Sequence, residues 1–528
     1  MKNLINTKLF VLAFLAMAIT SCTDLVIEGT DSILQEESPE FEGLTDPAGS
    51  LNSLYQSTYG MIGDQANWFA LNEVTTDETL VPTRGTDWSD NGIWRQLHNH
   101  RWKQDHGFLI TVWNQLNINQ FKASEIIDPL SSATTEEVAA AKFLRAFNMF
   151  FTLDFWGQVP FKEATAPNNE LPTTLTAAEA YDFIISDLND AISGLPSIGP
   201  STATNRANKA AAYYLKAKVV LNAERYTGST PNWADVISSV DAIEAEGYAL
   251  QAGYFDIFTP AVDTETIWYA NESLSIGNRI WNGLHYNHTT PNQGGGGWNG
   301  FSALSEFYDL FEGDASENYG MADGSPLNNQ EERRGFVPDA SSADEAVNYG
   351  FGYGFLIGQQ YDGDGSALTD RSGAPLVLTR ELDLNNSNET QGIRILKYHP
   401  NPSGVGVVAS DDSFRAHEIL FRFADAYLMK AEAMARNGSD VTTMINDLRT
   451  LRNASPLGSV SLNDILDERA RELYIEFWRR NDLVRFDQFT KDWEWKNAEE
   501  VGNDVRNLFP IPLAALVSNP NLTQNPGY

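Results

Sequence analysis

Apolar residues recur three and four positions apart over several long segments. Of all the features of the sequence, this spacing restricts most strongly which folds the chain can adopt. Residues 177–196 show it most clearly. Their apolar side chains fall on one face of a 3.6-residue period: Tyr181, Ile184, Ile185, Leu188, Ile192 and Leu195. Gly194 and Pro196 are residue types that commonly end a helix. The pattern therefore predicts an amphipathic helix that buries one face.

Three further segments follow the same design, rich in alanine and aromatic residues and each ending at a glycine: residues 208–228, 233–247 and 423–438. Helices of this kind, separated by short connections, favour stacked helical hairpins of the tetratricopeptide type. We therefore predict a mainly α-helical superhelix.

The periodic pattern stops between about residues 256 and 413. Glycine-rich runs replace it at 294–297, 350–354 and 362–365, with short β-prone runs such as 376–382 and 393–398 between them. Loops held by a rigid frame are where binding residues tend to lie. We predict one domain over residues 48–528, with a helical frame at about 48–255 and 414–528. A long loop-rich insertion, about 256–413, would carry the ligand site.

The first residues have the order of a bacterial lipoprotein leader. A basic start with Lys2 and Lys8 precedes an apolar run that is too short for a stop-transfer helix. Ile19-Thr20-Ser21-Cys22 then matches a lipobox, so residues 1–21 are predicted to be a signal peptide and Cys22 the lipidated residue. Several acyl chains anchor a protein stably. Residues 22–47 are polar and acidic, as expected of a flexible tether.

Composition excludes some classes of function. The chain has 36 basic and 71 acidic residues and a net charge of −35, which opposes binding to nucleic-acid phosphates. The charge also gives no reason to expect a strongly anionic ligand. Cys22 is the only cysteine, so no intramolecular disulfide can form.

Carboxylates and guanidiniums crowd the segment 468–486, and they could serve either catalysis or architecture. Glu472, Glu476 and Arg480 are four residues apart, and Arg469 lies three before Glu472. On one continuous helix these spacings would pair opposite charges on adjacent turns, each pair contributing ~0.2–0.5 kcal/mol. A general acid and base need pKa values that differ. Here each carboxylate has an arginine within reach, so the architectural interpretation is favoured.

The same segment, ERARELYIEFWRRNDLVRF, resembles the C-terminal signature of the SusD/RagB family of outer-membrane nutrient-binding lipoproteins. The tail LFPIPLAALVSNPNLTQNPGY, the segments at 142–161 and 422–436, and the lipobox resemble further parts of that family in the same order. The resemblance implies a tetratricopeptide-like superhelix that binds oligosaccharides, or in some members peptides, at the cell surface. It also implies delivery to a SusC-like TonB-dependent transporter, without catalysis and without a cofactor.

Recognition of a glycan needs flat aromatic faces for its C–H surfaces and a few planar polar side chains for its hydroxyls. Residues 75–102 and 278–301 offer both among glycines and prolines. The candidates are Trp88, Trp298, Trp94, Trp281, Tyr286, Asp77, Arg84, Asp87, Asn91 and Asn287. Trp88 and Trp298 rank highest because glycines and polar residues surround both.

Other signals are weaker. His98 and His100 lack the further ligands of a metal site, and Asp362–Gly365 fits a tight turn better than a calcium loop. Among ligands we expect a neutral glucan such as laminarin or starch. Peptides and uronate polymers such as alginate are the alternatives within the same scaffold. A glycoside hydrolase, with two carboxylates roughly 5–10 Å apart, is the alternative from another class.

Overall fold

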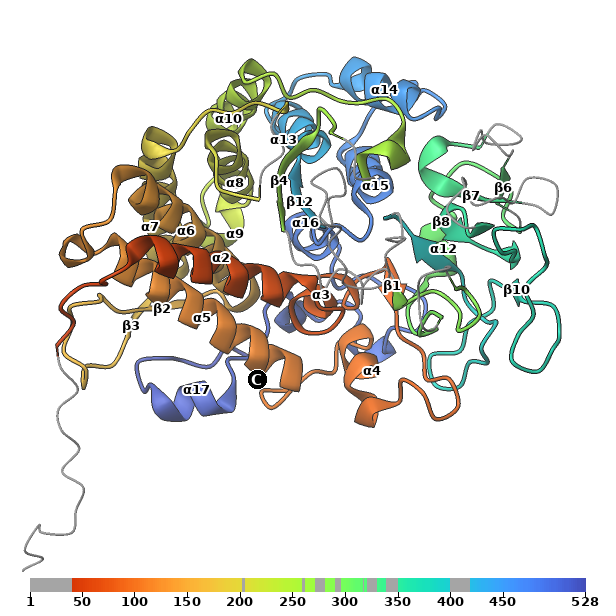
Figure 1. Cartoon of the computed structure of the whole chain (residues 1–528), viewed down its shortest axis with the longest axis horizontal. Coiled ribbons are helices and arrows are strands. Elements are labelled where there is room, and N and C mark those ends of the chain that lie inside the picture. Colours follow the sequence, from red (N-terminus) through yellow and green to blue (C-terminus); the bar gives the residue numbers. More distant parts are fainter. Residues whose placement is uncertain are drawn as a thin grey trace, which may run out of the picture. The chain divides into compact units, whose positions relative to one another are not determined.

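The computed structural model of the chain confirms a mainly helical fold (Figure 1). It describes residues 40–201, 205–258, 262–270, 281–289, 296–316, 318–320, 330–338, 350–398 and 418–528. Cys22, the leader and most of the tether therefore lie outside the described residues. The chain divides into two units, residues 1–41 with 167–170 and residues 42–166 with 171–528. The second unit holds all the elements below.

Helices occupy most of both ends of this unit. They are α2 (Pro47–Gly63), α3 (Asn67–Glu73), α4 (Ile93–His98), α5 (Gly107–Ile127), α6 (Thr135–Trp156), α7 (Ala177–Gly194), α8 (Lys209–Leu221), α9 (Ala223–Thr227), α10 (Trp233–Ala245), α12 (Ser305–Tyr308), α13 (Phe423–Arg436), α14 (Thr442–Leu451), α15 (Leu462–Leu473), α16 (Arg479–Arg485) and α17 (Leu513–Ser518).

Capping residues begin and end the main helices, and the glycine stop at residue 228 agrees with the sequence. The Thr176 side chain accepts the Glu179 N–H, and the Glu179 side chain returns to the Thr176 N–H, so a capping box starts α7. Gly228 ends α9 in the left-handed conformation, with φ 69°, which glycine adopts without steric penalty. One predicted boundary is wrong, because residues 208–228 form two helices, α8 and α9, which are separated at Asn222.

Helix α6 is the centre of the helical frame. It packs between α5 and α7, while α8 packs against α10, and α10 against α13 (Figure 1). Almost every α6 residue from Ala139 to Trp156 is buried. Its aromatic rings meet those of distant segments, for example Phe147 with Trp268 and Phe151 with Trp478. One aromatic core therefore joins the N-terminal and C-terminal helices.

Strands concentrate in the insertion. They are β1 (Thr79–Leu80), β2 (Val159–Phe161), β3 (Thr173–Leu175), β4 (Thr266–Ala270), β5 (Ser302–Ala303), β6 (Tyr319–Gly320), β7 (Gly335–Pro338), β8 (Tyr353–Leu356), β9 (Gly358–Gln359), β10 (Val377–Leu378), β11 (Arg394–Leu396) and β12 (Glu418–Arg422). The largest sheet has the order β11-β8-β7-β6, in which only the β6–β7 pair is parallel.

Two strand pairs tie the insertion to the helical frame. Strand β5 pairs with β1 of the N-terminal part, and β12 pairs antiparallel with β4. A second apolar cluster packs on the large sheet: Trp281, Leu284, Val337, Phe351, Leu356, Leu376, Leu378 and Leu396. The insertion therefore has a small apolar core of its own, and two strand pairs attach it to the helical frame.

The charged segment 468–486 is not one continuous helix, as the spacing analysis assumed. Helix α15 ends at Leu473, and α16 begins at Arg479. Between them Ile475 and Phe477 have φ of 51° and 75°. Their N–H groups donate to the buried carboxylates of Glu78 and Glu73, respectively. The segment keeps two local ion pairs at spacing three, Arg471 with Glu468 and Arg485 with Asp482. The pairs expected among Arg469, Glu472, Glu476 and Arg480 are instead replaced by partners further away along the chain.

Those distant partners form a buried ionic network around Glu472. Its carboxylate is fully buried and contacts three guanidiniums, those of Arg333, Arg422 and Arg452, at 3.2, 2.9 and 2.9 Å. These arginines hold the pKa of Glu472 well below its usual range, although burial alone would raise it. The network is architectural, as the sequence analysis favoured, because none of these side chains reaches solvent.

Buried histidines predict a loss of stability in weak acid. His98 ends α4, is 0% exposed, and has Nε2 2.8 Å from the Glu494 carbonyl oxygen. Burial lowers its pKa from 6.5 to about 4. Between these two values the unfolded chain binds a proton that the folded chain does not, so stability falls as the pH falls.

We expect His98 alone to lower the free energy of unfolding by about 2 kcal/mol between pH 7 and pH 5. Urea unfolding at the two pH values measures the loss. His98→Gln should make the difference between the two pH values smaller. An unchanged pH dependence in that variant would contradict the assignment.

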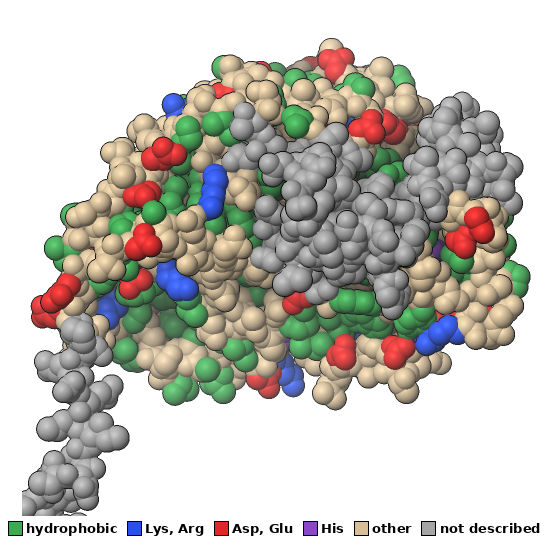
Figure 2. Space-filling model, viewed as in Figure 1, with side chains coloured by type: hydrophobic (Ala, Val, Ile, Leu, Met, Phe, Trp, Pro, Cys, Tyr) green, Lys and Arg blue, Asp and Glu red, His purple; other side chains and the backbone are tan. Residues whose placement is uncertain are grey.

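The surface agrees with the acidic composition. On the face in Figure 2, Asp and Glu side chains are scattered rather than gathered in one patch. Within the residues described, no helix has the length and hydrophobicity needed to cross a bilayer. The same residues contain no group of three or more His, Cys, Asp or Glu side chains placed to bind a metal.

Candidate functional site

A tight turn presents Trp88 at the surface. Arg84 and Asp87 exchange backbone hydrogen bonds of 3.0 Å across the turn, and Trp88 follows with φ 59°. A bulky residue rarely adopts this left-handed conformation, which costs ~1–3 kcal/mol unless the surroundings impose it. The indole is partly exposed and packs edge-on against Phe301. The surrounding structure therefore fixes the position of this ring.

A second segment, residues 296–301, brings Trp298 beside it. The Trp298 carbonyl oxygen accepts a 2.9 Å hydrogen bond from the indole Nε1 of Trp88. Close approach of this segment requires glycine, because a Cβ at Gly297 would overlap the Leu284 backbone and one at Gly300 would overlap the Trp88 ring. The glycine run in the sequence thus lets two tryptophans meet.

Tyr286 extends this surface with a polar edge. Its hydroxyl donates to Asp87 Oδ2 at 2.6 Å, and the Arg371 guanidinium lies 4.0 Å from its ring centre. Arg371 in turn pairs with Glu389 at 2.5 Å. Burial, followed by the hydrogen bond to Asp87, raises the pKa of Tyr286 to about 12. The phenol therefore stays protonated at neutral pH, and Arg371 and Glu389 largely cancel each other's charge.

Two buried arginines lie beneath. Arg84 and Arg394 each donate to the Ser302 hydroxyl at 2.9 Å, and neither forms an ion pair with a carboxylate of the described residues. Burial lowers the pKa of Arg84 to about 10, and burial together with Arg84 lowers the pKa of Arg394. Both guanidiniums also bond backbone carbonyls of residues 388–392. They hold that loop against the aromatic surface.

Four of the ten candidate residues are buried and cannot contact a ligand in this structure. Trp94 and Trp281 are 4% and 1% exposed. Trp94 packs on Phe301 behind Trp88, and Trp281 belongs to the core of the insertion. Asp77 is held by Arg479 at 2.7 Å, and Arg84 is occupied as above. Glycine and polar neighbours in the sequence did not place these side chains at the surface.

The other six candidates are accessible, and five of them meet in one region. Trp88, Asp87, Tyr286 and Trp298 are linked by the hydrogen bonds above. Asn287 follows Tyr286 and donates to the Thr369 carbonyl oxygen at 2.6 Å. Asn91 lies three residues after Trp88 and is exposed. Within the described residues, no hydrogen bond connects its side chain to the other candidates. Their contact with a ligand remains a prediction.

Sequence reasoning missed Arg371, Glu389 and Phe301. Arg371 and Glu389 lie in polar turns without any motif. They reach the surface only through the fold, which places residues 369–371 and 387–392 beside Tyr286 and Asn299. Phe301 could have been chosen from its place after Trp298, but an apolar side chain there is equally typical of a core position.

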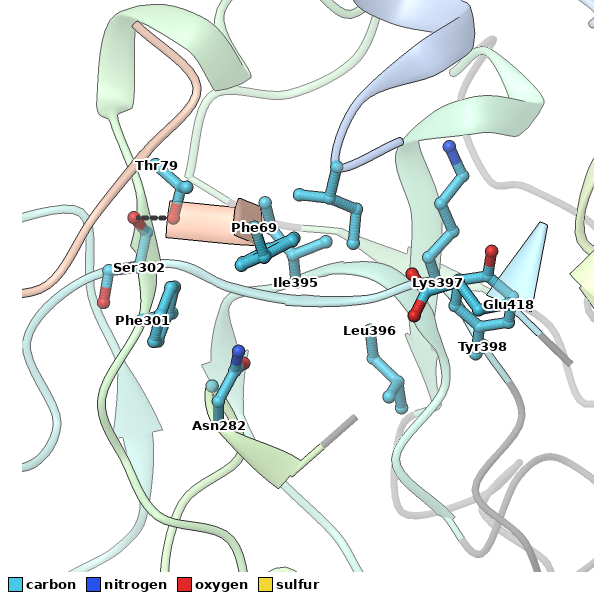
Figure 3. Close-up of a pocket in the computed structure, with 12 residues that line it drawn as sticks. Phe69, Thr79, Asn282, Phe301, Ser302, Ile395, Leu396, Lys397, Tyr398 and Glu418 are labelled. Carbon is cyan, nitrogen blue, oxygen red and sulfur yellow. Dashed lines mark hydrogen bonds between the residues drawn. The ribbon is translucent and has the colours of Figure 1, made fainter. Parts of the chain in front are cut away.

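A small cavity lies behind this surface. Phe301, Asn282 and Ser302 form one end of its wall, and Lys397 and Glu418 lie at the other (Figure 3). Its volume of about 40 Å³ has room for a few water molecules but not for a sugar ring. The cavity therefore does not compete with the surface as a ligand site.

The carboxyl pair that most resembles a glycosidase acid–base pair is also buried. Glu73 and Glu78 are 0% and 1% exposed and share a hydrogen bond, and burial, then Glu73, raises the pKa of Glu78. Glu73 also accepts a hydrogen bond from the Phe477 backbone N–H, and Glu78 accepts one from the Ile475 backbone N–H. A pair enclosed in this way shapes the turn after α15 and cannot reach a glycosidic bond.

Comparisons with known proteins identify the family. The SusD family pattern matches residues 264–528, and a pattern described as starch-binding, associating with the outer membrane, matches residues 38–221. The starch-binding protein SusD of Bacteroides thetaiotaomicron is 29% identical over 498 residues, which cover 89% of this chain and 86% of that protein.

Solved structures share the fold. A laminarin-binding SusD-like protein superimposes with a TM-score of 0.63 and 20% identity, covering 92% of this chain and all of that one. Surface glycan-binding protein A of Bacteroides thetaiotaomicron, solved with laminarihexaose, has a TM-score of 0.62 and 16% identity, covering 91% and 98%. These relatives are binding proteins, not enzymes. The chain belongs to the SusD family.

Proposed function

We propose that this protein captures a neutral glucan, such as laminarin or starch, at the surface formed by Trp88, Trp298 and Tyr286. The observation that carries the proposal is a pair of partly exposed tryptophans in adjoining segments, joined by the hydrogen bond from the Trp88 indole to the Trp298 backbone. Rigid aromatic rings bind the C–H faces of sugars at little entropic cost. Asp87, Asn287 and Arg371 then offer polar groups to the hydroxyls.

The remaining steps of the proposal rest on the leader and the family. Lipidation at Cys22 would anchor the protein to the outer membrane at the cell surface, and residues 22–47 would act as the tether. The bound glycan would pass, unmodified, to a SusC-like TonB-dependent transporter. The names of the starch-binding and laminarin-binding relatives support glycan capture and a neutral glucan.

Arg84 and Arg394 favour a second candidate, a uronate polymer such as alginate. Two buried guanidiniums that pair with no carboxylate of the described part of the chain raise the electrostatic potential beneath the aromatic surface. Neither guanidinium is accessible to a ligand, and Arg371, which is accessible, already pairs with Glu389. The neutral glucan therefore remains the main proposal.

Affinity electrophoresis against a panel of polysaccharides tests this function. We expect laminarin or starch to slow the protein selectively, and incubation with the same glycan to release no shorter products. Bovine serum albumin is the control for non-specific retardation. Selective retardation by alginate would replace the neutral glucan with the uronate polymer. Release of shorter products would overturn the non-catalytic assignment.

A further inference from the structure

A further exposed tryptophan lies in a hollow away from Trp88 and Trp298. Trp495 is 40% exposed and lines a depression of about 620 Å³ with Ser305, Arg380, Glu381, Leu382 and Glu494. Its φ of 66° is left-handed, and the Glu494 N–H donates to Glu306 Oε1 at 2.8 Å to fix the adjoining backbone. A tryptophan does not favour this backbone conformation by itself, so the neighbouring residues impose it and keep the indole at the surface.

The polar lining of this hollow suits hydroxyl groups. Arg380 makes two 2.7 Å bonds to Asp309, so its guanidinium is fixed and its charge is neutralised. The exposed carboxylate of Glu381 has no hydrogen-bond partner among the described side chains. A free carboxylate accepts hydrogen bonds from sugar hydroxyls and repels anions. An indole face with a carboxylate acceptor beside it is the combination that a neutral saccharide needs.

One loop links this hollow to the proposed site. Leu382 lines the hollow, and six residues later the Asn388 carbonyl oxygen accepts a hydrogen bond from Arg84. Six residues span at most about 20 Å even when fully extended. Helix α4 adds a second link, because His98 Nε2 lies 2.8 Å from the Glu494 carbonyl oxygen. A single polysaccharide chain can therefore reach both places.

We infer that Trp495 and Glu381 form a second saccharide subsite that binds a distant part of the same neutral polysaccharide. The inference rests on the function proposed above. A second contact on one chain raises the affinity for polymers without changing that for oligomers too short to reach it. The protein would then prefer long glucans over short ones.

Trp495→Ala tests this inference with two pairs of probes, laminarin with laminaritriose and soluble starch with maltotriose. Calorimetric titration should show a roughly ten-fold weaker affinity for the polymer of the pair that the protein binds, and no change for the trisaccharide. Trp495→Phe should restore most of the polymer affinity because it keeps an aromatic face. Val517→Ala, at an apolar side chain that is 79% exposed, is the matched surface control.

The outcomes separate the two proposals. If the wild-type protein binds neither polymer, the proposed neutral glucan is wrong, and this inference is overturned with it. If the wild type binds but Trp495→Ala leaves the polymer affinity unchanged, or weakens polymer and trisaccharide equally, only the second subsite is overturned. A thermal unfolding curve of each variant shows whether it is folded, and Glu381→Gln probes the same hollow without altering the strained backbone.

Discussion

Glu472→Gln should destabilise the protein by about 3–5 kcal/mol, the largest stability effect that we expect from a single substitution. The change keeps the size of the side chain but removes the one carboxylate, among the described residues, that pairs with all three of Arg333, Arg422 and Arg452. All three guanidiniums are buried, so water cannot replace the lost carboxylate. Arg452 loses the largest share of its ion pairing, because Glu265 then becomes its sole carboxylate partner among the described residues.

The midpoint of urea unfolding measures the effect, with Glu499→Gln as the matched control. Glu499 pairs with Arg101 at the surface, where both side chains are exposed, so its loss should cost less than about 1 kcal/mol. Equal shifts in the two variants would show that the buried network contributes no more than a surface ion pair. In that case the architectural role assigned to residues 468–486 would need another basis.

Local patterns in the sequence were enough to predict the helical frame. The apolar stripe of residues 177–196 appears as α7, with the capping box of Thr176 at its start. The glycine stop at Gly228 ends α9. Both features depend on residues within four positions of each other, and physical rules for such spacings are well determined.

The charged segment shows where local rules fail. Spacing alone paired Glu472 with Arg469, but Arg469 instead binds Asp425 and Asp482. Glu476 binds Lys397 and Arg422 rather than Arg480. A buried charged group pairs with the partner that offers the best geometry, whatever its distance along the chain. Only the fold shows which partner that is.

Some of the aromatic candidates are buried and others partly exposed, again because of contacts that are distant along the chain. Trp88 and Trp94 have nearly the same polar neighbours in sequence, but Trp94 lies on α4 facing Phe301 and is buried. Trp88 lies on the turn before α4 and is partly exposed. Composition could therefore select the segment that carries the site, but it could not select the ring that faces solvent.

Trp88→Ala and Trp298→Ala should each weaken glycan binding by about thirty-fold, or about 2 kcal/mol, while the protein stays folded. The loss follows from removing a flat apolar face, which at Trp88 is already fixed before the ligand arrives. The fold should survive because both rings are partly exposed and the buried Phe301 and Trp94 remain in place. Titration with laminarin or starch measures the affinity, and circular dichroism checks the fold.

Gly300→Ala tests the position of the Trp88 ring without removing it. A Cβ at residue 300 would overlap the Trp88 indole, which must then move away from Trp298. We expect an affinity loss of about ten-fold, smaller than that of Trp88→Ala because a displaced ring still offers some apolar area. Gly458→Ala is the matched control, since a Cβ there meets no atom within 4 Å. Normal binding by Gly300→Ala and both tryptophan variants would place the glycan elsewhere, because a ligand bound to this surface cannot be indifferent to all three changes.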